Sequence, residues 1–263
     1  MSEYLELKDL PKDYISYSQI NMYKRCPMQY RIRYVENKKA PPPGAIVAGQ
    51  ATHEALEYDL AQKITTKENL KTKEVLEIFS DSFERICSET KELTGEAPVF
   101  DKEPKEKVKD TTVKGIELYH MKEAVLLEPT AVEKKFLIEF KNVSYKIIGS
   151  IDTIHKDTLI IDFKTTKRYN KSILPPDQLK MYSLTIPKAE YRLDTIDCIE
   201  KPKIYKDLYT INTQTQKKYL QEINTIITAI KAELFYPNPG LNYMTCNMCG
   251  FGPKGKKWCE LWK

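Results

Sequence analysis

Alternating and apolar runs in the second half of the chain predict a β-sheet. The segments AVEKKFLIEF and VSYKIIGSID alternate apolar with polar residues, as strands with one covered face do, and Lys141-Asn142 would join them in a hairpin. Residues 158–161 continue as an apolar run that indicates a strand buried on both faces. The polar turn His155-Lys156-Asp157-Thr158 connects these last two strands. Further strands are expected around Thr195–Ile199 and Leu208–Ile211.

Helical periodicity dominates the first half of the chain and returns near its end. A first helix is expected after an N-cap at Ser16 or Ser18, and Pro27 should kink or restart it. The apolar spacing of residues 67–127 predicts a mostly helical region. Two more helices are expected, one entered through Pro175-Pro176-Asp177 and one over residues 214–235. The pattern therefore predicts an α/β protein in which a helical region precedes a β-core.

Composition narrows the class of protein. A chain of 263 residues can bury a full core, as one large domain or as a core with a helical elaboration. Hydrophobic residues make up 41% and charged residues 30%, which is typical of a soluble globular protein. No apolar run approaches the roughly 20 residues of a membrane span, and the N-terminus has no signal-peptide pattern, so we expect a cytoplasmic location. The net charge of +5 permits a polyanionic partner without requiring one.

Two acidic residues and a lysine mark the expected hairpin of residues 149–167. Asp162 and Lys164 are two residues apart and share one face of their strand, and Asp152 lies on the neighbouring strand. Converging carboxylates bind a hard divalent cation such as Mg²⁺. An ammonium beside them can orient a water or stabilise the charge that develops on a phosphate. The alternative is a strand end with solvated charges, because Asp-x-Lys is a common combination.

A helix with small side chains offers a third ligand. Gly49, His53 and Glu57 follow one another at intervals of four residues and therefore share one helical face. A lone histidine is usually structural, but the small residues around His53 favour an inward position from which it could bind the same metal ion. His120 and His155 have no comparable context, and we expect both at the surface.

Polar residues after the Asp162 strand extend this candidate site. Residues 165–171 form a basic, hydroxyl-rich loop that is suited to phosphate contacts, although such a loop can also be a solvated connection. Gln178 and Tyr182 are four residues apart in a helix, so an amide and a phenol lie on one side. They would form a second wall of the same cleft.

Four of the six cysteines form a second candidate site. Cys246 and Cys249 have a metal-chelating spacing, and Cys259 follows after a nine-residue loop. A fourth ligand must come from elsewhere, and Cys26 is the candidate. A reducing compartment disfavours disulfides, which supports a metal site. Cys87 and Cys198 are expected to be buried small hydrophobic residues.

A series of short motifs resembles one nuclease family. SYSQINMYKRCPMQY, GQATHEALE, GSID, IIDFKTTK and QLKMY precede the cysteine cluster in the order found in PD-(D/E)XK nucleases of the RecB-like type, which include the nuclease domains of RecB and AddB and the CRISPR-adaptation exonucleases. The resemblance implies an α/β, restriction-endonuclease-like core, a central mixed β-sheet flanked by helices. The expected domains are a helical region at 1–130 contributing Cys26 and His53, a nuclease core at 131–235, and a cysteine segment at 236–263 that packs against the N-terminal region.

The resemblance also implies roles for the residues of the first site. His53, Asp152 and Asp162 would bind Mg²⁺ or Mn²⁺, together with the backbone carbonyl of Phe163. Lys164 would activate or orient the attacking water. Gln178 and Tyr182 would position the substrate phosphate or Lys164.

At the second site, family members with comparable cysteines hold a 4Fe–4S cluster. The resemblance implies the same cofactor here, bound by Cys26, Cys246, Cys249 and Cys259. The spacer before Cys259 is longer than is common in these relatives, so zinc and unligated thiols stay open as alternatives.

The implied activity is hydrolysis of DNA phosphodiester bonds by an exonuclease that acts on single strands or DNA ends in recombination, repair or phage DNA processing. Such an enzyme would work in the cytoplasm of a prokaryotic cell or a phage-infected host, with a recombination or replication protein as a candidate partner. Tyr30, Tyr34 and Tyr182 would be available for base stacking. The alternatives are a structure-specific endonuclease and a non-catalytic DNA-binding subunit for recombination or adaptation; the intact Asp152, Asp162 and Lys164 argue against the latter.

Overall fold

The computed structural model describes residues 14–100, 102–140, 143–186, 189–239, 246–247 and 249–262. The chain folds into two compact units, each assembled from separate stretches of sequence. The first unit consists of Met1–Ala40, Lys135–Gly149 and Asn212–Lys263, and the second of Pro41–Lys134 and Ser150–Ile211. The three consecutive domains expected from the sequence therefore stay a prediction.

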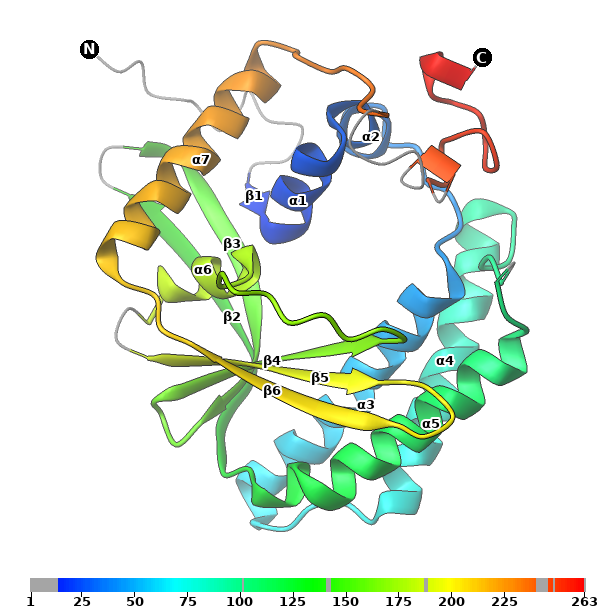
Figure 1. Cartoon of the computed structure of the whole chain (residues 1–263), viewed down its shortest axis with the longest axis vertical. Helices are drawn as coiled ribbons and strands as arrows, with labels where there is room; N and C mark the ends of the chain where they lie inside the picture. The colour runs from blue at the N-terminus through cyan, green and yellow to red at the C-terminus, as the bar shows by residue number, and fades with distance from the viewer. Residues whose placement is uncertain are drawn as a thin grey trace. The chain divides into compact units, whose positions relative to one another are not determined.

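The second unit is built on a mixed sheet, in which strands β4, β5 and β6 lie side by side (Figure 1). Strand β4 pairs antiparallel with β3 and parallel with β5, and β6 pairs antiparallel with β5. The bounds are β3 Val143–His155, β4 Leu159–Thr166, β5 Glu190–Asp197 and β6 Lys203–Tyr209. Strand β6 begins earlier than expected because its sequence KIYKDLY mixes lysines with apolar residues and hides the alternation.

Helices cover both faces of this sheet. The helices of the second unit are α3 Gly44–Thr66, α4 Thr72–Thr94, α5 Lys105–Lys122, η3 Ala124–Leu126 and α6 Asp177–Ser183. On one face, Ile161 and Phe163 of β4 pack against Leu56 of α3 and Tyr119 of α5. On the other face, Asp162 meets Tyr182 of α6. The predicted fold class, a mixed sheet flanked by helices, is confirmed, and α3 is fixed directly against the strand that carries the acidic residues.

A second hydrophobic cluster joins the three long helices. It contains Val47 and Ala51 of α3, Phe79 and Phe83 of α4, and Ile116 of α5. None of the helices in the described part of the chain combines the length and the apolarity that a membrane span requires.

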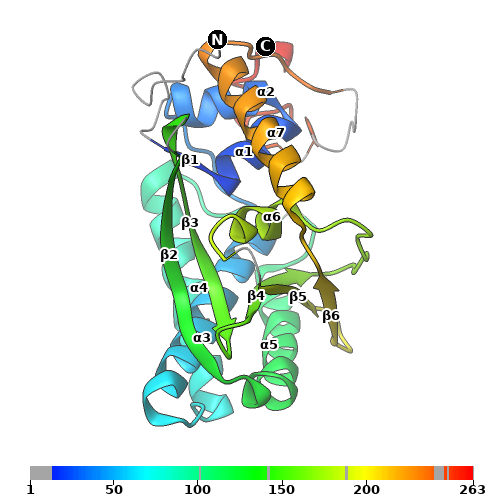
Figure 2. The same cartoon turned by 90° about the vertical axis from the view of Figure 1, so that its left-hand side faces the viewer.

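Strand β2, Pro129–Phe140, pairs with β3 in a long hairpin (Figure 2). The expected turn of this hairpin, Lys141-Asn142, lies outside the described residues. The turn between β3 and β4 is confirmed: the Thr158 N–H donates to the His155 carbonyl at 3.2 Å. Lys156 and Asp157 have φ angles of 50° and 59°, as in a type I′ turn, whose twist matches that of the flanking strands.

His120 corrects the sequence analysis, because it is buried rather than at the surface. Its Nδ1 lies 3.0 Å from the Thr72 hydroxyl, and its Nε2 lies 3.5 Å from Asp59 Oδ2. A polar residue in a helical pattern is expected to face water, but these polar partners from α3 and α4 make an inward position acceptable.

His155 is partly buried, and its hydrogen bond makes a pH-dependent prediction. The Glu128 backbone N–H donates to His155 Nδ1 at 2.9 Å, so this nitrogen must be unprotonated. Desolvation, followed by the charges of Lys156 and Arg192, lowers the pKa of His155 from 6.5. Because the unfolded state then binds more protons below pH 6.5, the contribution of His155 to stability is present above that pH and is lost as the pH falls through the folded-state pKa.

We therefore expect the imidazole resonances of His155 to titrate at a lower pH than those of a histidine in a model peptide, as measured by NMR. His155→Asn can accept the same hydrogen bond without titrating, so its melting temperature should fall less than that of the wild type between neutral and mildly acidic pH. If the melting temperatures of the two proteins fall equally with decreasing pH, this assignment is contradicted.

The first unit contains α1 Tyr17–Arg25, α2 Pro27–Tyr30, η2 Arg31–Val35, α7 Thr213–Lys231 and η4 Glu260–Trp262, with strand β1 Ile15–Ser16. The Ser16 hydroxyl caps α1 by accepting from the Gln19 N–H at 3.4 Å, and Pro27 restarts the chain as α2, as expected. Strand β1 pairs in parallel with Ile147 and Ile148 of β3.

Aromatic packing in this unit corrects a second expectation. The Tyr30 ring is fully buried and stacks on Phe235, with 6.2 Å between ring centroids. Tyr182, in the second unit, is only 2% exposed. Neither ring is available for base stacking, because each fills a core position instead.

Candidate active site

Three residues from α3, β2 and β3 bring metal-ligating atoms together in the second unit. One ligand atom from each of His53, Glu133 and Asp152 lies within 4.8 Å of the others. His53 Nδ1 is 3.3 Å from Asp152 Oδ2, which also accepts a hydrogen bond from the Phe163 N–H at 2.9 Å. The packing of α3 on β4 therefore holds the histidine against the carboxylate.

Asp162 is the first residue in a series of polar contacts next to this group. Lys164 Nζ lies 2.6 Å from Asp162 Oδ2. The Tyr182 hydroxyl donates to Asp162 Oδ1 at 3.1 Å, and the Gln178 amide donates to the Tyr182 hydroxyl at 2.7 Å. All four residues were expected at one site, and the structure brings them together. Asp162 does not belong to the group formed by His53, Glu133 and Asp152.

Burial and like charges perturb the ionisation of these residues. Desolvation, reinforced by repulsion from Asp162, raises the pKa of Asp152 well above its usual value. Desolvation also lowers the pKa of His53, with the Lys164 charge as the next cause. For Tyr182, desolvation and then the negative charge of Asp162 raise the pKa well above 10. The charge of Lys164 opposes this repulsion between the two buried carboxylates, and a bound cation would compensate it further.

The donor atoms fit a divalent cation. Asp162 is 1% exposed, and its Oδ2, which accepts no hydrogen bond, is paired with the Lys164 ammonium at 2.6 Å. Neighbouring ligand atoms around a six-coordinate ion with bonds of about 2.1 Å are about 3 Å apart, close to the 3.3 Å between His53 and Asp152. Carboxylates and an imidazole bind Mg²⁺, Mn²⁺ and related ions.

An open cleft of about 660 Å³ gives access to these residues. His53, Glu133 and Lys164 line it, together with Gly49 and Thr165. A side-chain carbon at Gly49 would come within 3.3 Å of the Thr165 hydroxyl, so the glycine allows α3 to approach the end of β4 closely.

The loop expected to contact phosphate already uses part of its charge within the protein. Lys167 forms an ion pair with Glu103, and Lys171 Nζ lies 3.6 Å from Asp207. Tyr169 of the same loop stacks on Tyr205 with 3.6 Å between ring centroids. A phosphate contact by these lysines stays a prediction.

Glu133 was missed by the sequence analysis. It lies in an alternating strand, where a glutamate is expected to face solvent. Its φ angle of 44° is left-handed, and such a residue redirects the strand in a way that alternation cannot reveal.

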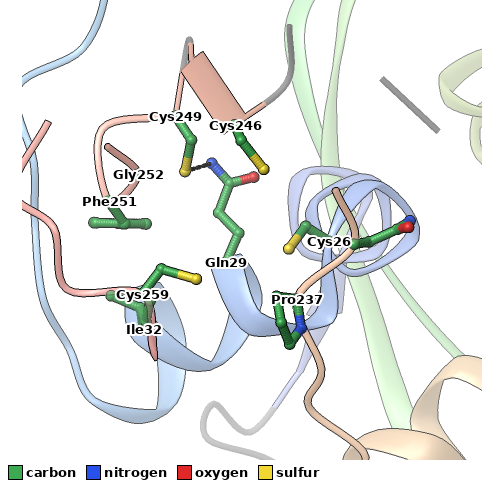
Figure 3. Close-up of a pocket in the computed structure, with 10 residues that line it drawn as sticks. Cys26, Gln29, Ile32, Pro237, Cys246, Cys249, Phe251, Gly252 and Cys259 are labelled. Carbon is green, nitrogen blue, oxygen red and sulfur yellow. Dashed lines mark hydrogen bonds between the residues drawn. The ribbon is translucent and has the colours of Figure 1, made fainter. Parts of the chain in front are cut away.

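The four cysteines of the second candidate site come together in the first unit. Figure 3 shows the side chains of Cys26, Cys246, Cys249 and Cys259 directed towards one space, although Cys26 is more than 200 residues away in sequence. Gln29 of α2 points into the same space and donates to Cys249 Sγ at 3.5 Å. Met28, Ile32 and Phe251 pack around it.

Two of these thiols, those of Cys249 and Cys259, have a raised pKa. Burial is the first cause that raises the pKa of both Cys249 and Cys259, and the negative charge that a nearby thiolate at Cys26 would carry acts in the same direction. Four thiols are the donors that iron–sulfur clusters and structural zinc ions use, and binding would release their protons.

Comparison with known proteins identifies a family. A sequence profile of the PD-(D/E)XK nuclease superfamily matches residues 14–259, a range that includes every residue of both candidate sites. A solved structure named "Putative exonuclease", from Eubacterium rectale, is similar at 14% identity and a TM-score of 0.47, over 86% of this chain and 84% of that chain. The structure of SSO0001 is similar at 20% identity and a TM-score of 0.32, over 56% of this chain and 73% of that chain. No curated protein matches.

Proposed function

Since the chain belongs to the PD-(D/E)XK nuclease superfamily, we propose that it is a metal-dependent nuclease that hydrolyses DNA phosphodiester bonds. The observation that carries this proposal is the contact of His53 with Asp152 beside the Asp162–Lys164 pair. A structural ion pair would not require two buried carboxylates, an imidazole and an ammonium to meet at the wall of an open cleft.

We assign the divalent cation to His53, Asp152 and Asp162, with the Phe163 carbonyl as a backbone ligand. The ion is Mg²⁺ or Mn²⁺. When bound, it lowers the pKa of a water molecule and neutralises charge on the phosphate. The protein residues hold the carboxylates together: the Phe163 N–H fixes Asp152, and the Tyr182 hydroxyl fixes Asp162.

Lys164 orients the attacking water in this proposal, and its positive charge stabilises the phosphate oxygens in the transition state. Its ammonium is kept near the acidic residues by Asp162. Gln178 acts one step further away, because its amide positions the Tyr182 hydroxyl that in turn orients Asp162.

We propose an exonuclease that acts on single strands or DNA ends, in recombination, repair or phage DNA processing. The test is a gel assay that compares circular single-stranded DNA, linear DNA with free ends and linear DNA with blocked ends, with and without Mg²⁺ or Mn²⁺. We expect metal-dependent loss of linear DNA only when an end is free. Cleavage of the circle would identify an endonuclease, and no cleavage of any substrate would indicate a DNA-binding subunit.

For the cysteine site we propose a 4Fe–4S cluster held by Cys26, Cys246, Cys249 and Cys259. The proposal rests on the convergence of the four side chains on one space and on the resemblance to relatives with comparable cysteines, and a zinc ion is the alternative that metal analysis would identify. The free space of about 20 Å³ is small, so Gln29 would withdraw when a cluster binds.

The cluster together with the nuclease site is the reason to place the protein in the RecB-like group. The same proposal includes a cytoplasmic location, in a prokaryotic cell or a phage-infected host, because DNA is accessible there and thiols stay reduced. A recombination or replication protein is the proposed partner.

A further inference from the structure

Glu133 has an unusual backbone conformation beside the proposed catalytic residues. It lies inside strand β2, yet its φ angle is 44°. A left-handed conformation is unfavourable for a residue with a long side chain, and it is retained when the surrounding structure requires it. In this conformation the carboxylate joins His53 and Asp152 within 4.8 Å.

Glu133 adds negative charge beside His53 and Asp152. After desolvation and the charge of Asp162, Glu133 is a further negative charge that raises the pKa of Asp152. Glu133 also contributes to raising the pKa of His53, against the dominant effect of desolvation. The charge of Lys164 lowers the pKa of Asp152 and so offsets part of this repulsion, and a cation bound between the carboxylates would offset more.

We propose, on the basis of the nuclease function above, that Glu133 is an additional side-chain ligand of the catalytic cation. Together with His53 and Asp152 it supplies one nitrogen and two carboxylate donors, a set suited to Mg²⁺ and Mn²⁺. Glu133 comes from β2, whereas the predicted ligands come from α3, β3 and β4. The cation would thus join a fourth element of the second unit.

The test measures Mn²⁺ binding by calorimetry and by the loss of the free Mn²⁺ electron paramagnetic resonance signal, on the full chain without DNA. Glu133→Gln should raise the Mn²⁺ dissociation constant roughly 10- to 100-fold. Glu57→Gln is the matched control, because Glu57 lines the same cleft one helical turn after His53 but is outside the ligand group; its dissociation constant should equal that of the wild type.

Thermal unfolding of the metal-free proteins separates this role from a structural one. If Glu133 is a ligand, Glu133→Gln removes a repulsion, and its melting temperature should equal or exceed that of the wild type. Glu133→Gly should raise it further, because glycine adopts the left-handed conformation without strain. A lower melting temperature for Glu133→Gln with unchanged Mn²⁺ affinity would overturn the proposal, as would a wild-type protein that binds no Mn²⁺.

These binding measurements do not depend on catalysis. If the wild type binds Mn²⁺ and Glu133→Gln weakens binding, but no DNA is cleaved, the proposed nuclease function fails while the role of Glu133 stands. If DNA is cleaved and Glu133→Gln binds Mn²⁺ as the wild type does, only the role of Glu133 fails.

Discussion

Asp162→Asn is expected to lower the rate of metal-dependent DNA hydrolysis at least about 10³-fold. The change removes one negative charge next to Lys164, and the asparagine oxygen can still accept the hydrogen bond from Tyr182. Because Asp162 is buried beside another carboxylate, the free energy of unfolding without metal should stay the same or rise. Initial rates on end-labelled DNA and a thermal melt measure the two quantities.

Asp197→Asn is a suitable control for this loss of activity. Asp197 is another buried aspartate, 6% exposed, and it lies on β5, the strand next to β4. It belongs neither to the group of His53, Glu133 and Asp152 nor to the polar contacts around Asp162. The variant should therefore hydrolyse DNA as the wild type does. Full activity of Asp162→Asn, with Asp197→Asn equally active, would show that the proposed centre is not the site of hydrolysis.

Cys26→Ala is expected to remove the metal cofactor and to destabilise the first unit. The wild type, purified without oxygen, should show the broad visible absorbance of an iron–sulfur cluster and about four iron atoms per chain. The variant should lose both, because a cluster held by three cysteines is labile. Loss of a structural metal commonly unfolds the segment around it, so protease cleavage after residue 235 should accelerate.

The matched variant for this experiment is Cys87→Ala, since Cys87 lies on α4 and far in sequence from the four converging cysteines. It should keep the iron and the visible absorbance. One zinc ion per chain in the wild type would replace the iron–sulfur assignment by a zinc site. If the wild type contains neither iron nor zinc, the four cysteines are unligated thiols.

The sequence contained enough information to place Asp152, Asp162 and Lys164. Apolar runs identify β3 and β4, the turn at residues 155–158 fixes their pairing, and the period of two then sets which side chains share a face. His53 was predicted from its small neighbours and from the resemblance. Local pattern and motif order were sufficient because these residues lie on regular elements with short connections.

Glu133, His120 and Tyr30 could not be placed in the same way. The direction of Glu133 depends on a left-handed residue inside a strand, and no glycine or asparagine indicates it. His120 is buried because Asp59 and Thr72, from two other helices, surround it. Tyr30 is covered by Phe235, from the opposite end of the chain. Each of these outcomes depends on tertiary partners that a sequence pattern does not show.

The composition of the first unit has a consequence for biosynthesis. Its parts come from three separate stretches of sequence, and Cys26 is more than 200 residues before Cys246, Cys249 and Cys259. A nascent chain still held by the ribosome can therefore complete Pro41–Lys134 and Ser150–Ile211 while the other unit waits for its final cysteines. Chains that stall between Ile211 and Cys246 would contain the residues of the proposed nuclease site but only Cys26 of the four cysteines of the proposed cofactor site.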